Sequence, residues 1–368
     1  MKSRSSKAPK TPAARAPKVL IVKLSSLGDV VHAMPAVQDL HRELPAAQID
    51  WVVERAFAPL LTRCQGVSHV IPCDLRRWRK SPLARQTRLE WIAFRQQLQS
   101  QTYDAVIDLQ GLTKSAMVSW LALTTEKGKR YGMANRTDGS SFEAPARWVA
   151  DVAVKLEPHV HAVQRARLLC AAAMDYTVST PPHFGLQPGR MAITQPTPTG
   201  LEDNPFVQRK PCVALVHGTS RADKQWPLSH WIELGQRLNH SGFLVALVHG
   251  NAREKEHSEA IAAQLSDAWV WPILGLEAVT DTLARCAGVI GVDSGLSHIA
   301  VALDLPHVQI YNFDTAWRTG PVPFDTPDAA PSPQARQARQ VSVFAAPHPS
   351  LDAVWQAWES LATPVFCR

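Results

Sequence analysis

Two short segments each combine an apolar, strand-like run, a glycine and the start of a helix-like run. The first is Lys23–Asp29, in which Gly28 follows the apolar residues Val19–Leu24, and the second is Gly291–His298, in which Gly295 follows another apolar run. Such a turn presents free backbone N–H groups and the positive end of a helix dipole, which is how α/β proteins hold phosphates. Two of these turns, one in each half, predict two α/β domains with a nucleotide-linked substrate between them.

The first turn also carries a carboxylate, Asp29, just beyond the first predicted strand. Open α/β sheets bind ligands at the carboxyl ends of their strands. A phosphate site gains nothing from an added negative charge, so this position favours acid–base chemistry. A plain helix cap is the alternative, because carboxylates are common at helix starts.

A polar loop, His217–Pro227, follows the first predicted strand of the second half. Thr219 and Ser220 offer hydroxyl groups and Lys224 offers an ammonium group, a set suited to binding a diphosphate. A lysine in such a place neutralises charge on a departing phosphate. Polar loops of this composition are common, so this pattern alone is only moderately specific.

The second glycine turn predicts further phosphate contacts through the backbone N–H groups of Ser294, Gly295 and Leu296. His298 falls on the first turn of the following helix, where a phosphate contact and a structural role are equally open. Glu254 begins a helix after another predicted strand, a position from which an acid binds ribose hydroxyls or simply favours the helix dipole.

A basic segment lies between Arg63 and Arg95, where eight basic residues stand against two acids. Its densest part, residues 75–80, contains Arg76, Arg77 and Lys80. One interpretation is a solvated helix start. The other is a site for phosphate or carboxylate groups of a large anionic partner.

Around these segments, apolar runs alternate with helical patterns, which predicts parallel βαβ units with right-handed crossovers. A proline-rich stretch from Tyr176 to Pro211 divides them into two series and predicts a linker. The predicted strands are Val19–Leu24, Ile49–Glu54, His69–Cys73, Tyr103–Leu109, Cys212–His217, Phe243–His249, Val289–Val292 and Val308–Phe313. The predicted helices are Val30–Glu43, Pro82–Ser100, Leu112–Leu123, His161–Met174, Ser229–Asn239, Glu254–Leu265, Glu277–Cys286 and Ser350–Ala362.

The bulk properties narrow the class of protein. A chain of 368 residues with 45% hydrophobic and 19% charged residues fits two globular domains. Six of the seven excess positive charges lie in residues 1–18, so the body is nearly neutral and a nucleic-acid-binding role is disfavoured. Six cysteines without CxxC spacing fit a reducing cytoplasm. We expect no membrane-spanning or secretory segment, because no apolar run is long enough and none follows the basic start.

The chain resembles the ADP-heptose:lipopolysaccharide heptosyltransferases of glycosyltransferase family nine, because it contains six characteristic segments in the order of that family. They are Lys23–Asp29, Trp51–Glu54, Arg76–Lys80, Asp108–Gly111, His217–Pro227 and Asp293–His298. The Ser25–Asp29 and Arg76–Lys80 forms resemble the heptosyltransferase I branch rather than the II branch. The resemblance covers Val19 to Pro321 and the final helix.

The resemblance implies an α/β GT-B fold, in which two Rossmann-like domains with parallel sheets face each other across a cleft. It places an acceptor-binding domain at residues 18–176, a linker at 177–210 and an ADP-sugar-binding domain at 211–345. A C-terminal helix, residues 346–368, would dock back on the N-terminal domain. Residues 1–17 form a basic tail, interpreted as disordered or as weakly attracted to anionic lipid.

The implied reaction moves L-glycero-D-manno-heptose from ADP-heptose to the first Kdo of Kdo2-lipid A, with inversion and without a required metal or cofactor. It belongs to lipopolysaccharide inner-core biosynthesis and would occur peripherally at the cytoplasmic face of the inner membrane. Asp29 would be the general base, and Lys224 would stabilise the departing diphosphate. The other implied donor-binding residues are Thr219, Ser220, Glu254, Asp293, Ser294, Gly295, Leu296 and His298. The implied acceptor-binding residues are Ser26, Gly28, Arg76, Arg77 and Lys80.

One segment departs from the family pattern: Asn312-Phe313-Asp314-Thr315 stands where the family usually has Gly-Pro-Thr, which changes the phosphate contacts expected there. Two alternatives to the implied function stay open. The first is a heptosyltransferase for another core position or another ADP-sugar. The second is a non-catalytic sugar-nucleotide-binding module, which would need no base such as Asp29 facing an acceptor.

Overall fold

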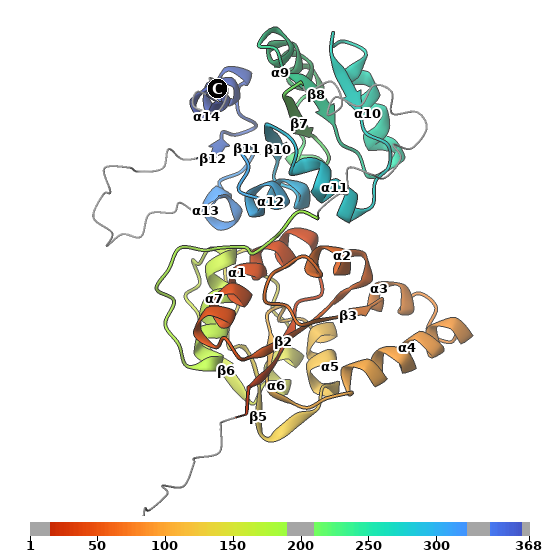
Figure 1. Cartoon of the computed structure of the whole chain (residues 1–368), viewed down its shortest axis with the longest axis vertical. Coiled ribbons are helices and arrows are strands. Elements are labelled where there is room, and N and C mark those ends of the chain that lie inside the picture. The colour runs from red at the N-terminus through yellow and green to blue at the C-terminus, as the bar shows by residue number, and fades with distance from the viewer. Residues whose placement is uncertain (1–14, 190–209, 322–338, 363–368) are drawn as a thin grey trace, which may run out of the picture.

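The computed structural model describes residues 15–189, 210–321 and 339–362. These residues form two α/β domains, one above the other in Figure 1. Each domain contains a six-stranded sheet, and the two sheets have the same topology. The predicted α/β class with two Rossmann-like halves is therefore confirmed.

The N-terminal sheet is parallel throughout and has the strand order β3-β2-β1-β4-β5-β6. Its strands are β1 (Lys18–Val22), β2 (Gln48–Glu54), β3 (His69–Cys73), β4 (Tyr103–Asp108), β5 (Thr124–Met133) and β6 (Val152–Val154). Its helices are α1 (Leu27–Glu43), α2 (Ala58–Leu61), α3 (Leu75–Trp78), α4 (Arg85–Leu98), α5 (Thr113–Leu121), α6 (Ala144–Val149) and α7 (Ala162–Met174), with a 3-10 turn, η1, at Arg55–Phe57.

The C-terminal sheet is also parallel, with the order β12-β11-β10-β7-β8-β9. Its strands are β7 (Cys212–Val216), β8 (Leu244–Leu247), β9 (Ala268–Val270), β10 (Gly288–Val292), β11 (His307–Tyr311) and β12 (Gln340–Phe344). Its helices are α9 (Leu228–His240), α10 (Ala252–Ala262), α11 (Leu276–Leu283), α12 (Gly295–Ala302), α13 (Ala316–Thr319) and α14 (Leu351–Ala362), with a 3-10 turn, η2, at Ala222–Lys224.

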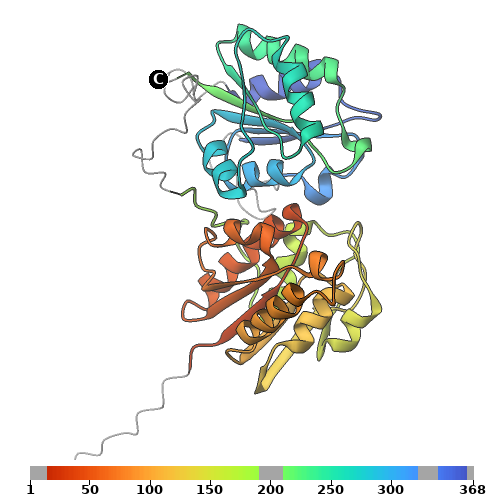
Figure 2. The ribbon, with the colours of Figure 1, turned by 90° about the vertical axis from the view of Figure 1, so that its right-hand side faces the viewer.

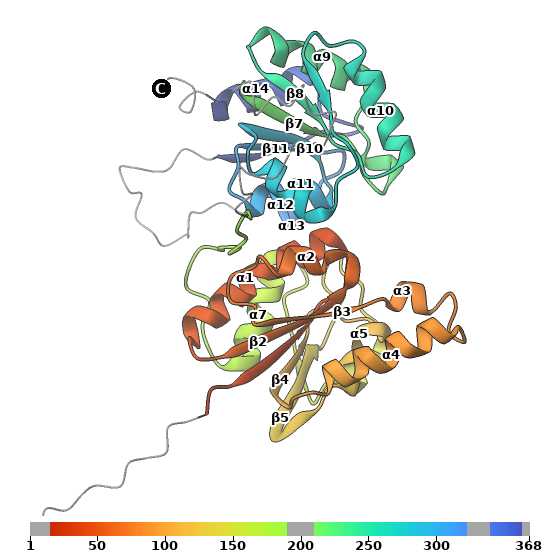
Figure 3. The same ribbon diagram turned by 45° about the vertical axis from the view of Figure 1, so that its right-hand side comes forward.

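Helices cover both faces of each sheet, which explains why the central strands are continuous apolar runs. In β1, Val19 and Ile21 pack on the side of α1 and α7, whereas Leu20 and Val22 pack on the side of α4 and α5. Strands buried on both faces lose the polar alternation of half-exposed strands. Figures 2 and 3 show these layers from two further directions.

Because the two sheets have the same topology, each has one switch point in the same place. The strand order reverses between β1 and β4 in one sheet and between β7 and β10 in the other. Open α/β sheets bind ligands at such points, beyond the carboxyl ends of the strands. All four strands lead into segments that the sequence analysis singled out.

The C-terminal helix corrects one expectation. The described part of residues 346–368 contains α14, which packs on β11, β12 and α9 of the C-terminal domain, not on the N-terminal domain. Val354 and Trp358 are buried in the same cluster as Val213 and Ile290 of the C-terminal sheet. The predicted helix Ser350–Ala362 is confirmed, but the apolar face of a helix does not specify which sheet it covers.

The bounds of most other predicted strands and helices differ little from those in the structure. The predicted helix Pro82–Ser100 begins at Arg85, after the separate short helix α3. The strands β5, β6, β9 and β12 were not predicted. Residues 1–14 of the predicted tail and 190–209 of the predicted linker lie outside the described residues.

The packing of α14 gives a first prediction. Trp358 is 1% exposed and stands against Gly288, where a Cβ would lie 2.6 Å from the indole ring. Trp358→Ala should lower the free energy of unfolding by about 3–5 kcal/mol, since it empties a large buried site. Chemical denaturation measures this change, with the exposed Gln356→Ala as the control. Equal stability of the two variants would contradict the packing of α14 on the C-terminal sheet.

Candidate active site

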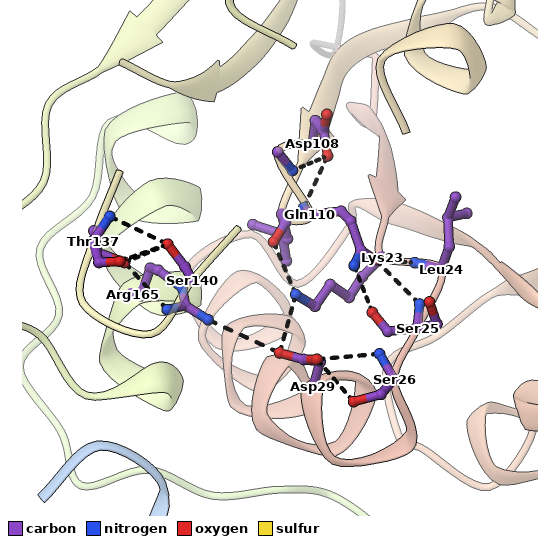
Figure 4. A network of polar contacts seen from close by, with 12 residues as sticks. Lys23, Leu24, Ser25, Ser26, Asp29, Asp108, Gln110, Thr137, Ser140 and Arg165 are labelled. Carbon is purple, nitrogen blue, oxygen red and sulfur yellow. Dashed lines mark hydrogen bonds and ion pairs between the residues drawn. The ribbon is translucent and has the colours of Figure 1, made fainter. Parts of the chain in front are cut away.

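The loops after β1 and β4 are tied together at the N-terminal switch point by one amide side chain. The Oε1 atom of Gln110 accepts hydrogen bonds from the backbone N–H groups of Leu24 (2.9 Å) and Ser25 (3.1 Å), and its Nε2 donates to the carbonyl of Ser25 (2.6 Å). Lys23 Nζ donates to the carbonyl of Leu109 at 3.1 Å. The strand end that leads to Asp29 is therefore held rigidly (Figure 4).

Asp29 lies on the first turn of α1 among several positive groups. Its Oδ2 accepts hydrogen bonds from the backbone N–H (3.1 Å) and hydroxyl (2.9 Å) of Ser26. Its Oδ1 lies 3.5 Å from Lys23 Nζ and 4.0 Å from Arg165. Burial raises the pKa of this carboxyl, but Lys23 and the Ser26 hydrogen bonds outweigh burial and hold its pKa well below its usual range. The side chain remains 37% exposed, so the ionised carboxylate is open to a substrate.

At the second switch point, Asp293 binds two residues of the predicted donor set. Its Oδ2 accepts a hydrogen bond from Lys224 Nζ at 2.5 Å, and its Oδ1 lies 3.2 Å from His298 Nε2. Burial raises the pKa of Asp293, but the contacts with His298 and Lys224 lower it more, so the carboxylate is ionised. The structure thus brings together Lys224, Asp293 and His298, which lie on three different segments.

The remaining predicted donor-binding residues lie beside this group. Thr219 and Ser220 follow β7 at the same edge of the sheet. The carboxylate of Glu254 accepts a hydrogen bond from the backbone N–H of Gly250 at 2.7 Å. A Cβ at Gly218 would lie 2.8 Å from Cδ of Glu254, so this glycine makes room for the acid. Glu254 is both a helix-terminal residue and part of the pocket wall, so the two interpretations coexist.

The two glycine turns face each other. A Cβ at Gly28 would lie 2.6 Å from Cδ2 of His298, and a Cβ at Gly295 would lie 2.7 Å from Cδ2 of Leu27. The ring of His32, one turn further along α1, lies 4.2 Å from the ring of His298 between centroids. The N-termini of α1 and α12 therefore meet across the gap between the domains.

A cavity of about 780 Å³ opens at this junction. Ser26 and Gly28 line it from the N-terminal domain, and all the predicted donor-binding residues line it from the C-terminal domain. Asp29 is not part of the lining, but Ser26, Leu27 and Gly28 of the same turn are. Several other residues of the wall were not among the predicted site residues: His217, His249, Asn251, Arg253, His257, Leu274, Leu276 and Val279.

The three predicted basic residues of the acceptor site differ in whether acidic side chains already pair with them. Arg77 forms ion pairs with Asp74 and Glu90, so its charge is already matched by two acids. Arg76 and Lys80 are exposed, and neither forms an ion pair among the described residues. The backbone N–H of Arg76 donates to the carboxylate of Glu54 at 3.3 Å.

Two further cations near the site were missed. Lys114 Nζ donates to Ser25 Oγ at 2.9 Å, and its pKa is lowered by burial and by the nearby charges of Arg76 and Arg79. Arg165, on α7, reaches Asp29 from a segment with no motif of its own. The hydrogen bond of Lys114 to Ser25 and its charge repulsion with Arg76 place the basic segment near the first glycine turn.

The segment that departs from the family pattern supports the lysine loop. Asn312 Nδ2 donates hydrogen bonds to the backbone carbonyls of Asp223 (3.0 Å) and Gln225 (2.9 Å), on either side of Lys224. Asn312 itself is 7% exposed. Its side chain therefore positions the backbone that carries Lys224.

Comparisons with known proteins agree with this arrangement. The family model described as glycosyltransferase family 9 (heptosyltransferase) matches residues 91–344. Lipopolysaccharide heptosyltransferase 1 of Pseudomonas aeruginosa is 37% identical over 299 residues, which cover 80% of this chain and 78% of that protein. The chain belongs to glycosyltransferase family 9.

Solved structures of family members share the fold. E. coli heptosyltransferase WaaC with ADP matches with a TM-score of 0.76 and 31% identity, over 94% of this chain and 100% of that one. The same enzyme with ADP-2-deoxy-2-fluoro heptose matches with a TM-score of 0.71 and 30% identity, over 93% and 99%. Lipopolysaccharide heptosyltransferase 2 of E. coli is only 26% identical, over 90% of this chain and 89% of that protein.

The role of Asn312 in this family 9 chain gives a second prediction. Asn312→Ala removes both hydrogen bonds to the loop, and kcat/KM for the sugar-nucleotide donor should fall by about one order of magnitude. Steady-state kinetics at varied donor concentration measures this effect. Asp314→Ala, at an exposed side chain two residues further on, is the matched control. If the Asn312→Ala variant had the same kinetics as the wild type, the loop would hold Lys224 in place without the Asn312 side chain.

Proposed function

We propose that this chain transfers L-glycero-D-manno-heptose from ADP-heptose to the first Kdo of Kdo2-lipid A, as lipopolysaccharide heptosyltransferase I. Membership of family 9 supports glycosyl transfer. The chain is 37% identical to the Pseudomonas aeruginosa protein named heptosyltransferase 1 but only 26% identical to the E. coli heptosyltransferase 2. The observation that carries the proposal is the placement of Asp29 and the Lys224–Asp293 pair on opposite sides of one gap.

The donor half of the cavity suits a nucleoside diphosphate sugar. Lys224 and the N-terminus of α12, with Ser294, Gly295 and Leu296, provide positive potential for the diphosphate. Thr219 and Ser220 add hydroxyl donors, and Asp293 with His298 faces the region of the sugar. Leu274, Leu276 and Val279 form an apolar wall suited to a flat base, and Glu254 is placed to accept hydrogen bonds from ribose hydroxyls.

The reaction in this scheme is a direct displacement. The acceptor hydroxyl oxygen forms a bond to the anomeric carbon while the bond from that carbon to the diphosphate oxygen breaks, which inverts the configuration. The electron pair leaves with the diphosphate, whose new charge Lys224 balances. The hydroxyl proton passes to the carboxylate of Asp29, which is ionised before the reaction.

The acceptor side is basic, as an acceptor with carboxylates and phosphates requires. Arg76, Lys80 and the newly identified Lys114 are the groups we assign to it. Arg77 contributes less, because Asp74 and Glu90 already hold its side chain. Ser26 and Gly28, which line the cavity next to Asp29, are the turn residues that we assign to the acceptor.

We also propose that the enzyme works without a bound metal and at the cytoplasmic surface of the inner membrane. The charge on the leaving group is met by Lys224 and helix N-termini in this scheme, so no cation is needed for that step. None of the described helices is long and apolar enough to cross a bilayer. Binding to the membrane surface would therefore involve side chains on the outside of the domains.

Mass spectrometry of Kdo2-lipid A incubated with the protein and ADP-heptose tests the proposed function. The expected product gains one heptose, and Asp29→Asn should lower kcat by about 10²–10⁴-fold while donor binding by calorimetry changes little. A product formed only with another acceptor or another ADP-sugar would favour the alternative, a heptosyltransferase for another core position or a transferase for another ADP-sugar. Donor binding without any transfer would favour a non-catalytic module.

The ion pair between Lys23 and Asp29 gives a prediction on pH. Activity that needs ionised Asp29 is lost as the pH falls through its pKa, which lies well below its usual range in the folded protein. Lys23→Met removes the main group that lowers this pKa and leaves the burial that raises it. The acid limb of kcat/KM should therefore move to higher pH.

The control for this experiment is Lys114→Met, which removes a nearby cation that hydrogen-bonds Ser25 rather than Asp29. Its acid limb should stay at the wild-type pH, although acceptor KM rises. An unchanged acid limb in Lys23→Met would mean that Asp29 is not the group whose ionisation limits turnover.

A further inference from the structure

One side of the N-terminal domain exposes large apolar side chains at unusual density. Among the described residues, ten large hydrophobic side chains are exposed, and seven of them fall between residues 83 and 148. They are Leu83 (86%), Leu89, Ile92, Met117, Trp120 (65%), Leu123 and Trp148 (78%). In the described part of the C-terminal domain, Ile273, Phe313 and Phe344 are the only large hydrophobic side chains exposed to this degree.

These side chains belong largely to one helical layer. Phe94 and Leu98 of α4 and Val118 of α5 are buried in the same cluster against the sheet. The opposite stripes of both helices must therefore face solvent on the same side of the molecule. Gln99 Nε2 donates to the carbonyl of Leu121 at 2.8 Å, which joins the C-terminal ends of the two helices. Figure 3 shows α3, α4 and α5 together, on the side away from α1 and α7.

The outer side of α4 is also basic. Arg85, Arg88 and Arg95 are exposed around Leu89 and Ile92, and these arginines form no ion pair among the residues that the structure describes. The single acid of the helix, Glu90, is occupied by Arg77 and by the indole N–H of Trp78 at 2.8 Å. We call the set Leu83, Arg85, Arg88, Leu89, Ile92 and Arg95 the α4 face.

We propose that the α4 face docks on an anionic lipid bilayer, with the apolar side chains entering the interface and the arginines meeting lipid phosphates. Arginine beside exposed leucine and isoleucine on one helix is the composition of helices that lie in a membrane surface. An acidic protein partner would match the charges but would leave Leu83, which is 86% exposed, without an apolar layer to enter. The uncompensated positive charge decides in favour of anionic lipid over a second copy of this chain, which carries a net charge of +7 and the same basic face.

Docking here also fits the position of the site, and in this respect the inference rests on the proposed lipid acceptor. The short helix α3, with Arg76, precedes α4 and lies close to Lys114 and the first glycine turn. A bilayer on the α4 face would therefore border the acceptor side of the cavity. The sugar of a membrane-embedded lipid would have a short path to Asp29.

Vesicle co-sedimentation of the full-length protein tests the proposal without any turnover. The protein should bind vesicles of phosphatidylcholine mixed with phosphatidylglycerol and bind pure phosphatidylcholine vesicles much less. Arg85→Gln and Arg88→Gln should each weaken binding to the anionic vesicles about fivefold. Leu89→Glu combined with Ile92→Glu should weaken it by at least about tenfold. The matched control is Ile273→Glu, at a side chain 71% exposed on the other domain, which should bind as wild type.

A second comparison separates the α4 face from the basic N-terminal segment of the sequence. Lys2, Arg4, Lys7 and Lys10 are replaced together by Gln in the full chain. Binding that survives this change and is lost in the Leu89/Ile92 variant supports the proposal. Binding lost only with the four N-terminal substitutions, or equal binding of the α4 variants and wild type, overturns it.

Transfer to a deacylated, water-soluble Kdo acceptor shows whether the α4 variants are folded, because it should be unchanged in them. Absence of transfer by the wild type would contradict the proposed function but leave the vesicle result standing. Normal transfer with no vesicle binding would reject the docking surface alone.

Discussion

The close approach of α1 and α12 is the constraint on which the site depends. Gly28 and Gly295 have no side chains, so His298 and Leu27 of the opposite domains fill the space that a Cβ would occupy. Because both helices begin at this contact, their positive N-terminal ends converge on one gap. A single hydrophobic cluster runs from the N-terminal sheet through this junction into the C-terminal sheet, so the relative position of the two turns is fixed by packing.

Each half of the gap then holds one acid against its own cations. Asp29 is balanced by Lys23 and Arg165, and Asp293 by Lys224, with the ring of His298 as a further contact. In the proposed reaction the two pairs have different fates. Asp29 loses its negative charge when it takes a proton, whereas Lys224 must turn from Asp293 toward a diphosphate that gains charge. The pair with Asp293 keeps the ammonium group in place beforehand, which reduces the reorganisation that the transition state requires.

The parts of this structure that follow from local sequence were predictable, and the parts that depend on tertiary contacts were not. β1 and β10 were predicted because both of their faces are buried and their residues are continuously apolar. β5 was missed because it is an only partly buried strand rich in charged residues, and its sequence resembles a loop. The glycine turns and Lys224 carry local signals. Arg165 has none, because its role comes only from the packing of α7 beside α1.

The burial of the Lys23 ammonium group is unfavourable for folding, and its effect on Asp29 explains why it is present. It is 5% exposed, and burial lowers its pKa, so its charge is held in an environment that disfavours it. A buried ion pair of this kind adds little to stability, and an apolar pair of the same volume would pack as well. An apolar pair would leave no carboxylate at the mouth of the turn. Burying the cation behind Asp29 keeps the acid ionised while 37% of the Asp29 side chain stays exposed. The arrangement is best explained by the chemistry it permits rather than by its contribution to folding.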